Sequence, residues 1–176
     1  MSDLLEKYPE EVQAILAKYP PGQKRSAVMP LLYLAQREAV QETGRLYVSM
    51  AAMDQISALL DISTTEVASI VGFYSLYYDV PSGRYRLQVC TDLPCALRGA
   101  DQFLQELCKR LNIHPGETTA DGLITVEAVM CLAACDRAPM FQLQSGVGLS
   151  YHENQSVDSA MALIESLRLE ASGKRR

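Results

Sequence analysis

Apolar side chains recur at helical spacing through the first 80 residues of the chain. The pattern predicts four helices, over about 9–18, 25–41, 49–60 and 64–77. Pro30 falls early in the second helix, so it either lies in the first turn or bends the helix, and Gly44 ends it. The third and fourth helices each follow a Ser or Thr that can act as an N-cap. We therefore expect residues 1–80 to form an all-helical unit.

After Pro81-Ser82-Gly83 the period of the apolar residues changes from that of a helix to that of a strand. Tyr85, Leu87 and Val89 alternate with polar residues, which predicts a strand that ends near Cys90. The elements predicted after it are a helix, a strand, a hairpin of two strands and a final helix, at about 97–111, 123–129, 140–144 with 147–151, and 157–170. The order β-α-β-β-β-α over 81–176, behind a helical arm, predicts an α/β chain.

Four of the five cysteines occur in two short clusters. Cys90 and Cys95 follow the first predicted strand, and Cys131 and Cys135 follow the second. If these strands are parallel neighbours joined by the helix at 97–111, their carboxyl-end loops lie side by side. Four thiolates would then meet near the surface. An odd number of cysteines without a secretory signal argues against a disulfide scaffold.

The spacing of these cysteines leaves the kind of site open. C-x₄-C and C-x₃-C allow a four-thiolate zinc site or a [2Fe–2S] cluster with two thiolates per iron. The plant-type ferredoxin pattern fails because Arg98 stands where its third cysteine would be. Thiol-oxidoreductase chemistry is less favoured, since C-x-x-C is absent. Spacing alone favours a metal and leaves iron and zinc about equal.

We interpret the other possible ligands, Cys108, His114 and His152, as residues outside the metal site. Cys108 lies in the middle of a predicted helix, where a lone cysteine usually packs as a small apolar side chain. His114 and His152 are isolated, and we interpret them as partly exposed surface residues.

Charge and hydropathy exclude two classes of partner. Net charge is −5 and neither half of the chain is basic, so we expect no nucleic acid. No apolar run approaches the roughly 18 residues of a membrane span, so we expect no direct membrane insertion. The N-terminus has no recognisable targeting pattern, which predicts a cytoplasmic, bacterial protein rather than an organellar precursor.

Several motifs occur in a fixed order along nearly the whole chain. They include Gly72-Phe73-Tyr74-Ser75, Pro81-Ser82-Gly83, Cys95-Ala96-Leu97-Arg98-Gly99, Cys131-Leu132-Ala133-Ala134-Cys135 and Ala138-Pro139. This set resembles the thioredoxin-like [2Fe–2S] ferredoxin family, most closely its branch of small cluster-bearing subunits of NADH:quinone oxidoreductases, the respiratory complex I. The resemblance implies a thioredoxin-like domain at 81–176 and a helical docking domain at 1–80.

The resemblance also implies cofactors and partners. One [2Fe–2S] cluster would be held by Cys90, Cys95, Cys131 and Cys135. From their position in the loops, the backbone N–H groups of 91–94 and 132–134 are the expected donors to sulfur. FMN and NADH would lie on a flavin-binding partner subunit, because this chain has no G-x-G-x-x-G loop. The other partners would be peripheral-arm subunits of complex I, on the cytoplasmic side of the cell membrane. The alternatives are the equivalent subunit of an NAD-linked hydrogenase or formate dehydrogenase, and a structural zinc module.

Two residues beside the cysteines depart from the family pattern. Met130 replaces a usual Glu, which should make reduction slightly easier because a nearby negative charge is lost. Ala133 replaces a usual Gly, which predicts a φ below zero at this residue. The family likeness also raises the expectation of a cis peptide at Ala138–Pro139.

Overall fold

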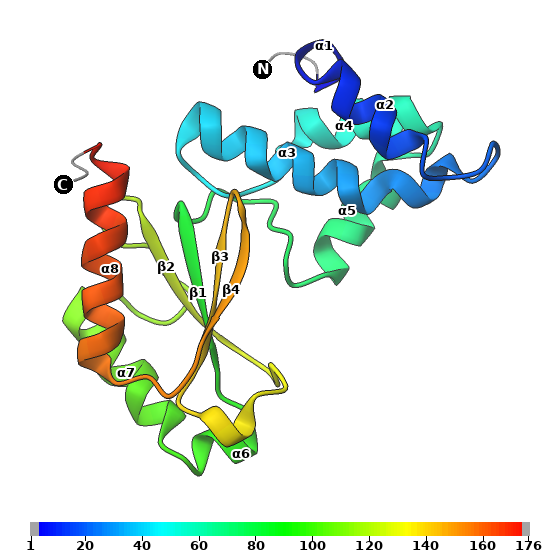
Figure 1. Cartoon of the computed structure of the whole chain (residues 1–176). Helices are drawn as coiled ribbons and strands as arrows, with labels where there is room; N and C mark the ends of the chain where they lie inside the picture. The colour runs from blue at the N-terminus through cyan, green and yellow to red at the C-terminus, as the bar shows by residue number, and fades with distance from the viewer. Residues whose placement is uncertain (1–3, 174–176) are drawn as a thin grey trace. The chain divides into compact units, whose positions relative to one another are not determined.

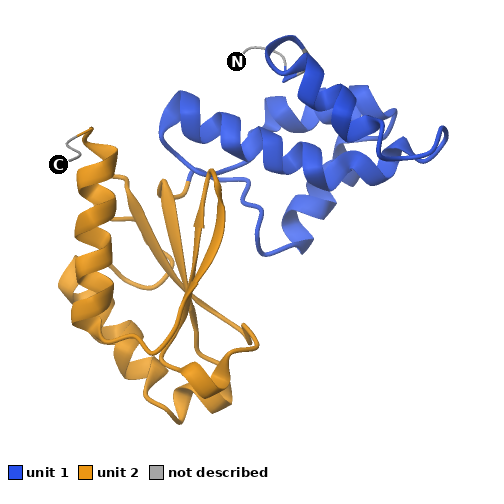
Figure 2. Cartoon of the chain, viewed as in Figure 1, with its two compact units in different colours: residues 1–81 blue, residues 82–176 orange. Residues whose placement is uncertain are grey.

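The computed structural model describes residues 4–173 of the chain. The chain divides into two compact units, residues 1–81 and 82–176 (Figure 2). Between residues 4 and 173 no helix is both long and apolar enough to cross a membrane.

The first unit is helical over its described residues (Figure 1). Its elements are α1 (Leu4–Lys7), α2 (Pro9–Leu16), the 3₁₀ turn η1 (Lys24–Ala27), α3 (Val28–Thr43), α4 (Met50–Leu60) and α5 (Thr64–Phe73). All four predicted helices are present, and Pro30 lies in the first turn of α3, where its missing N–H has no intrahelical partner to lose. The predicted helix at 64–77 ends earlier, since Tyr74 has an extended backbone. The one-turn helix α1 was not predicted.

Capping residues fix where these helices begin and end. The Ser49 hydroxyl accepts a hydrogen bond from the Ala52 N–H at 3.2 Å, and Ser63 and Glu66 form a capping box at the start of α5. Gly44 ends α3 with a left-handed φ of 71°. The boundaries are therefore encoded locally, by the first and last turns.

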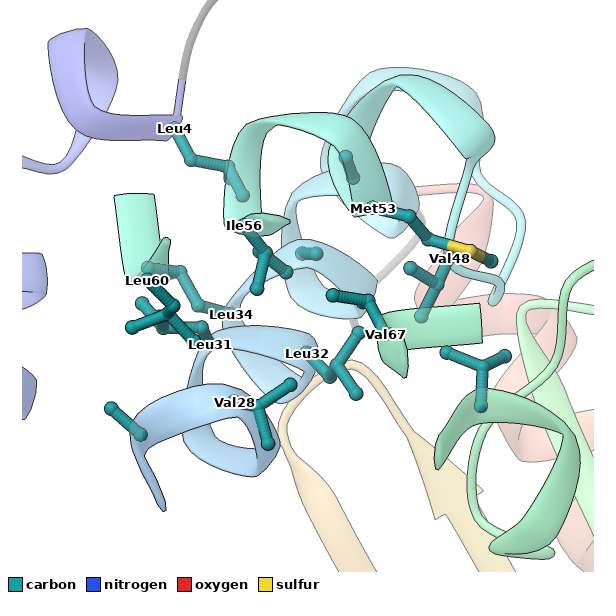
Figure 3. Close-up of a cluster of buried hydrophobic side chains, with 14 of the residues drawn as sticks. Leu4, Val28, Leu31, Leu32, Leu34, Val48, Met53, Ile56, Leu60 and Val67 are labelled. Atoms are coloured by element: carbon teal, nitrogen blue, oxygen red, sulfur yellow. The ribbon is translucent and has the colours of Figure 1, made fainter. Parts of the chain in front are cut away.

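The core of the first unit lies between α3, α4 and α5. Figure 3 shows side chains of all three helices gathered in one cluster, among them Leu31, Leu32, Ile56 and Val67. Ion pairs tie the N-terminal helices to α3: Arg37 donates to both carboxylate oxygens of Glu11, at 3.0 and 2.5 Å. The buried carboxylate of Glu38 accepts from Lys7 and Tyr8.

The second unit is a four-stranded mixed sheet with helices. In chain order it contains β1 (Tyr85–Cys90), α6 (Leu93–Ala96), α7 (Ala100–Leu111), β2 (Ile124–Val129), the 3₁₀ turn η2 (Cys135–Arg137), β3 (Phe141–Ser145), β4 (Gly148–His152) and α8 (Val157–Ala171). The strand order is β2-β1-β3-β4. β1 and β2 are parallel, with Tyr85 opposite Ile124, whereas β3 is antiparallel to both β1 and β4. The predicted β-α-β-β-β-α order and the parallel crossover are confirmed.

The two faces of this sheet differ in chemistry. One face is apolar and packs against α7 and α8, which lie together on one side of the sheet in Figure 1. The other face carries Arg86, Gln88, Gln142 and Gln144, which are also buried. Arg86 donates to Glu127 at 2.5 Å and to Gln144 at 2.8 Å, so its charge is paired on the sheet itself.

At Gly83, just before β1 begins, the chain passes very close to the backbone at the start of β2. Its N–H donates to the Thr125 hydroxyl at 2.6 Å. A Cβ at this position would lie 2.7 Å from both the Leu123 carbonyl oxygen and the Thr125 nitrogen. Only glycine fits without moving the backbone of the neighbouring strand.

Candidate metal centre

The four candidate cysteines come from two loops at one edge of the sheet. Cys90 is the last residue of β1 and lies opposite Val129 of β2. Because the strands are parallel, the loops that follow them emerge side by side, at the end of the sheet where Figure 1 shows α6. Cys95 lies in α6, Cys131 follows β2, and Cys135 begins η2.

The first loop turns Cys95 inward by means of the short helix α6. The Asp92 carboxylate caps this helix by accepting from the Leu93 N–H at 3.0 Å. The Cys95 N–H donates to the Asp92 carbonyl at 2.8 Å, which closes the turn. The Cys95 side chain is fully buried, at 0% exposure, next to Cys90 at 1%.

The second loop contains a backbone N–H that points to a cysteine sulfur. The Ala133 N–H donates to Sγ of Cys131 at 3.3 Å. It is one of the donors predicted at 132–134. Ala133 itself has a φ of 58°. The expectation that an alanine here keeps φ below zero is therefore wrong: the loop takes the left-handed turn that a glycine would normally make, and the N–H···S bond accompanies it.

The peptide bond between Ala138 and Pro139 is cis, as the family likeness suggested. It lies between η2 and β3, and the Cys90 N–H donates to the Met140 carbonyl at 3.3 Å just beyond it. That hydrogen bond attaches the second cysteine loop directly to the end of β1.

The sulfur atoms influence one another's ionisation. Burial raises the pKa of the Cys95 thiol to about 12, and the neighbouring sulfurs of Cys90 and Cys135 contribute to the rise. Burial and the Cys131 sulfur likewise raise the pKa of Cys135. Cys95 therefore lies within reach of sulfurs from both loops.

The raised pKa values do not by themselves indicate a metal, because burial raises the pKa of the Cys108 thiol in the same way. Crowded and buried thiols lose their protons readily only when a positive ion compensates the charge. Four thiols from two adjacent loops are also the donor set of a [2Fe–2S] cluster, in which each iron takes two of them. Among the described residues, no three His, Cys, Asp or Glu side chains are grouped as a site for a single metal ion.

The other candidates are placed as predicted. Cys108 is buried in α7 among apolar side chains, and burial raises the pKa of its thiol to about 11. His114 is exposed. His152 is partly buried and stacks on Phe141, with ring centroids 4.9 Å apart.

Large apolar side chains are exposed on the two cysteine loops. Leu93 is 69% exposed, Leu97 81% and Met130 79%. We call these three residues the apolar rim. Sequence patterns did not predict it: Leu97 was predicted only as the start of the helix at 97–111, whereas in the structure it is the exposed residue that ends α6.

Comparison with known proteins gives one family for most of the chain. The model of the family described as thioredoxin-like [2Fe-2S] ferredoxin matches residues 12–168. The chain is 42% identical over 132 residues to NADH-quinone oxidoreductase subunit 2 of Thermus thermophilus, a match that covers 75% of this chain and 70% of that protein. It is 37% identical over 159 residues to an NADH-quinone oxidoreductase subunit of Rhizobium meliloti, covering 90% of this chain and 88% of that protein.

A solved structure shares the fold. The match is to a polypeptide in the crystal structure of an air-oxidised NAD⁺-reducing [NiFe]-hydrogenase, with a TM-score of 0.62 and 21% identity. It covers 80% of this chain but only 23% of the hydrogenase polypeptide. At this identity the likeness concerns the fold alone.

Proposed function

The chain belongs to the thioredoxin-like [2Fe–2S] ferredoxin family, and from that premise we propose that it is the electron-transfer subunit of an NADH:quinone oxidoreductase. The proposal is carried by one observation: the two cysteine pairs lie on adjacent loops of a chain that resembles such subunits over most of its length. In this assignment the chain is part of an oxidoreductase and holds no NADH site of its own.

We assign the cluster ligands as Cys90, Cys95, Cys131 and Cys135. The bound cluster would supply one-electron redox chemistry. The chain's own residues determine its surroundings. The buried side chains of Cys90 and Cys95 keep water from one side of the site, and the Ala133 N–H stabilises negative charge on the Cys131 sulfur.

The partner in this proposal is the flavin- and NADH-binding subunit, which would exchange an electron with the cluster. A partner must approach the exposed side of the site, where Cys131 and the apolar rim lie. Exposed apolar side chains are typical of the centre of a protein interface. The helical unit at 1–81 would be a second docking surface for the partner subunit, and the complex would lie on the cytoplasmic side of the cell membrane.

The cluster assignment is tested by anaerobic purification of the full chain. We expect a red-brown protein with two irons and two acid-labile sulfides per chain. The Cys131→Ser variant should lose the visible spectrum or hold it only weakly, whereas Cys108→Ser should keep it. A colourless protein that contains zinc would overturn the assignment in favour of the zinc module.

The rim is tested by substituting one of its members and a matched control. Leu97→Gln changes a side chain that is 81% exposed, and Leu169→Gln changes one that is 55% exposed on α8. We expect both variants to keep the cluster spectrum, but only Leu97→Gln to co-purify poorly with the flavin subunit and to be reduced slowly by NADH. Equal behaviour of the two variants would contradict the role of the rim.

The equivalent subunit of an NAD-linked hydrogenase or formate dehydrogenase is the main alternative. The fold likeness to a hydrogenase polypeptide agrees with it. The identity of the subunits that co-purify with the chain distinguishes these complexes.

A further inference from the structure

The loop that carries Cys135 is fastened by the segment that joins β4 to α8. The Asn154 N–H donates to the Arg137 carbonyl at 2.7 Å, and the Gln155 N–H donates to the Pro139 carbonyl, also at 2.7 Å. These acceptors lie two and four residues after Cys135. Two consecutive N–H groups of one segment thus hold both sides of the turn that follows the cysteine.

Bonds within the loop are longer. Inside η2 the Arg137 N–H donates to the Ala134 carbonyl at 3.0 Å, and the Ala138 N–H donates to the Cys135 carbonyl at 3.4 Å. The Arg98 side chain adds a bond to the Ala138 carbonyl at 3.4 Å. The shortest of these bonds are therefore those from residues 154 and 155.

A side-chain ion pair repeats the same connection. Arg137 donates to Glu153 at 3.1 Å and to Asp136 at 3.3 Å. The Arg137 and Glu153 side chains are 54% and 40% exposed. An ion pair this exposed contributes little, so the backbone bonds carry the connection.

The direction of the two N–H groups depends on an unusual residue conformation. Asn154 has a φ of 50°, in the left-handed region that Asn tolerates and β-branched residues avoid. The Gln155 side chain closes the turn by donating to the Glu153 carbonyl at 2.9 Å. Residue 154 is therefore the position at which a substitution disturbs both donors together.

We propose that residues 153–155 form a clamp that positions Cys135 for the cluster, with Asn154 as its critical positioning residue. The clamp rests on the proposed function, because it requires Cys135 to be a ligand. It acts on the ligand loop through backbone bonds and contributes no ligand itself. Outer residues that orient metal ligands typically change metal affinity by about 10–100-fold when they are substituted.

The chain contains a matched control for this position. Asn112 ends α7 with a φ of 55°, so it has the same residue type and backbone conformation as Asn154. It follows the C-terminal end of α7, whereas Cys95 lies in α6, before the N-terminal end of α7. Asn112→Val and Asn154→Val should therefore destabilise the fold to a similar degree, and only the second should reach the cysteine site.

The experiment measures the bleaching rate of the visible spectrum under an iron chelator, the EPR spectrum of the reduced cluster and its midpoint potential. We expect Asn154→Val to lose its cluster about tenfold faster than the wild type and to show an altered EPR spectrum. Asn112→Val should match the wild type in bleaching rate, EPR spectrum and midpoint potential. Asn154→Gly, which accepts the left-handed φ, should restore wild-type behaviour. If Asn154→Val does not fold, Asn154→Ala takes its place, because alanine is not β-branched and is less strained at a left-handed φ.

The outcomes separate the two proposals. If Asn112→Val bleaches as fast as Asn154→Val, the effect is one of general stability and the clamp is refuted. An Asn154→Val protein with an unchanged bleaching rate, EPR spectrum and potential also refutes it. A wild-type protein that contains no iron would overturn the proposed function, and the clamp with it.

Discussion

The left-handed alanine in the second cysteine loop gives the sharpest test of the structure. Ala133 has a φ of 58° and an exposed side chain. We expect Ala133→Gly to stabilise the chain, because glycine adopts this conformation without the clash between Cβ and the carbonyl oxygen. The N–H that donates to Cys131 is retained, so the visible spectrum of the cluster should not change.

The magnitude follows from three contributions. The left-handed conformation costs an L-residue about 1–2 kcal/mol, which the substitution removes. Glycine also makes the unfolded chain more flexible, which lowers the free energy of unfolding by about 0.4–1 kcal/mol. The methyl group is exposed, so its loss removes little buried area. The net expectation is a gain of about 0.5–1 kcal/mol in the free energy of unfolding.

Chemical unfolding and thermal melting of the purified chain measure this gain. For a chain of 176 residues it corresponds to a rise of about 1–4 °C in Tm. The control is Ala134→Gly at the next position, where φ is −132° and no strain is relieved. That variant should be neutral or less stable than the wild type. If Ala133→Gly lowers Tm as Ala134→Gly does, the assignment of strain to Ala133 is wrong.

Three further predictions concern packing, pH and thiol reactivity. Gly83→Ala should destabilise the chain by more than about 2 kcal/mol, because the added Cβ would lie 2.7 Å from backbone atoms at the start of β2. Gly72→Ala in α5, where the added Cβ meets open space, should instead stabilise the chain by about 0.5–1 kcal/mol. Urea unfolding measures both variants, and similar changes in stability would contradict the close approach at Gly83. Hydrogen bonds from Arg37 lower the pKa of Glu11 in the folded chain. The pair therefore stabilises the fold fully at pH values above about 4.3, the ordinary pKa of Glu, and this stability is lost as the pH falls through the lowered pKa of the folded state. The contribution is about 1 kcal/mol at most for so exposed a pair, and Glu11→Gln should remove that part of the pH dependence in unfolding measured between about pH 6 and 3. Burial raises the pKa of Cys108 to about 11, so its thiol should resist alkylation at about pH 8 until the chain unfolds; rapid labelling of the native protein, located by mass spectrometry, would contradict its burial.

Much of the architecture could be predicted from the spacing of apolar residues. The helices of the first unit, the parallel pair β1 and β2, and the location of the four cysteines at one sheet edge all follow from local periodicity and the crossover rule. The predicted helix at 64–77 was too long because Tyr77 continues the apolar spacing. In the structure its hydroxyl donates to the Met29 carbonyl at 3.1 Å, so packing against α3 rather than helix periodicity accounts for its burial.

Other features depend on contacts that a sequence pattern cannot show. Arg86 and Gln88 alternate with apolar residues in the way that solvent-facing residues do, yet they are buried with polar partners on adjacent strands. The left-handed φ of Ala133 accompanies a bond to sulfur, and residue identity alone predicted the opposite sign. The proposed clamp at 153–155 acts through backbone hydrogen bonds to a loop about 17 residues earlier, and although Asn at 154 is a residue type that tolerates a left-handed φ, it does not indicate which carbonyls the neighbouring N–H groups meet.

The parallel pairing of β1 and β2 has a consequence for the order of events as the chain folds. Within each cysteine pair the residues are five and four positions apart, so each pair can be brought together by a single local turn. The two pairs are joined only when β1 meets β2, whose partners Tyr85 and Ile124 are 39 positions apart. Closing so long a loop is entropically costly and slow compared with forming α7 between them. In the proposed ligand assignment, iron and sulfide that meet the chain before this pairing would find two half-sites, and insertion of the complete cluster would follow the pairing of β1 and β2.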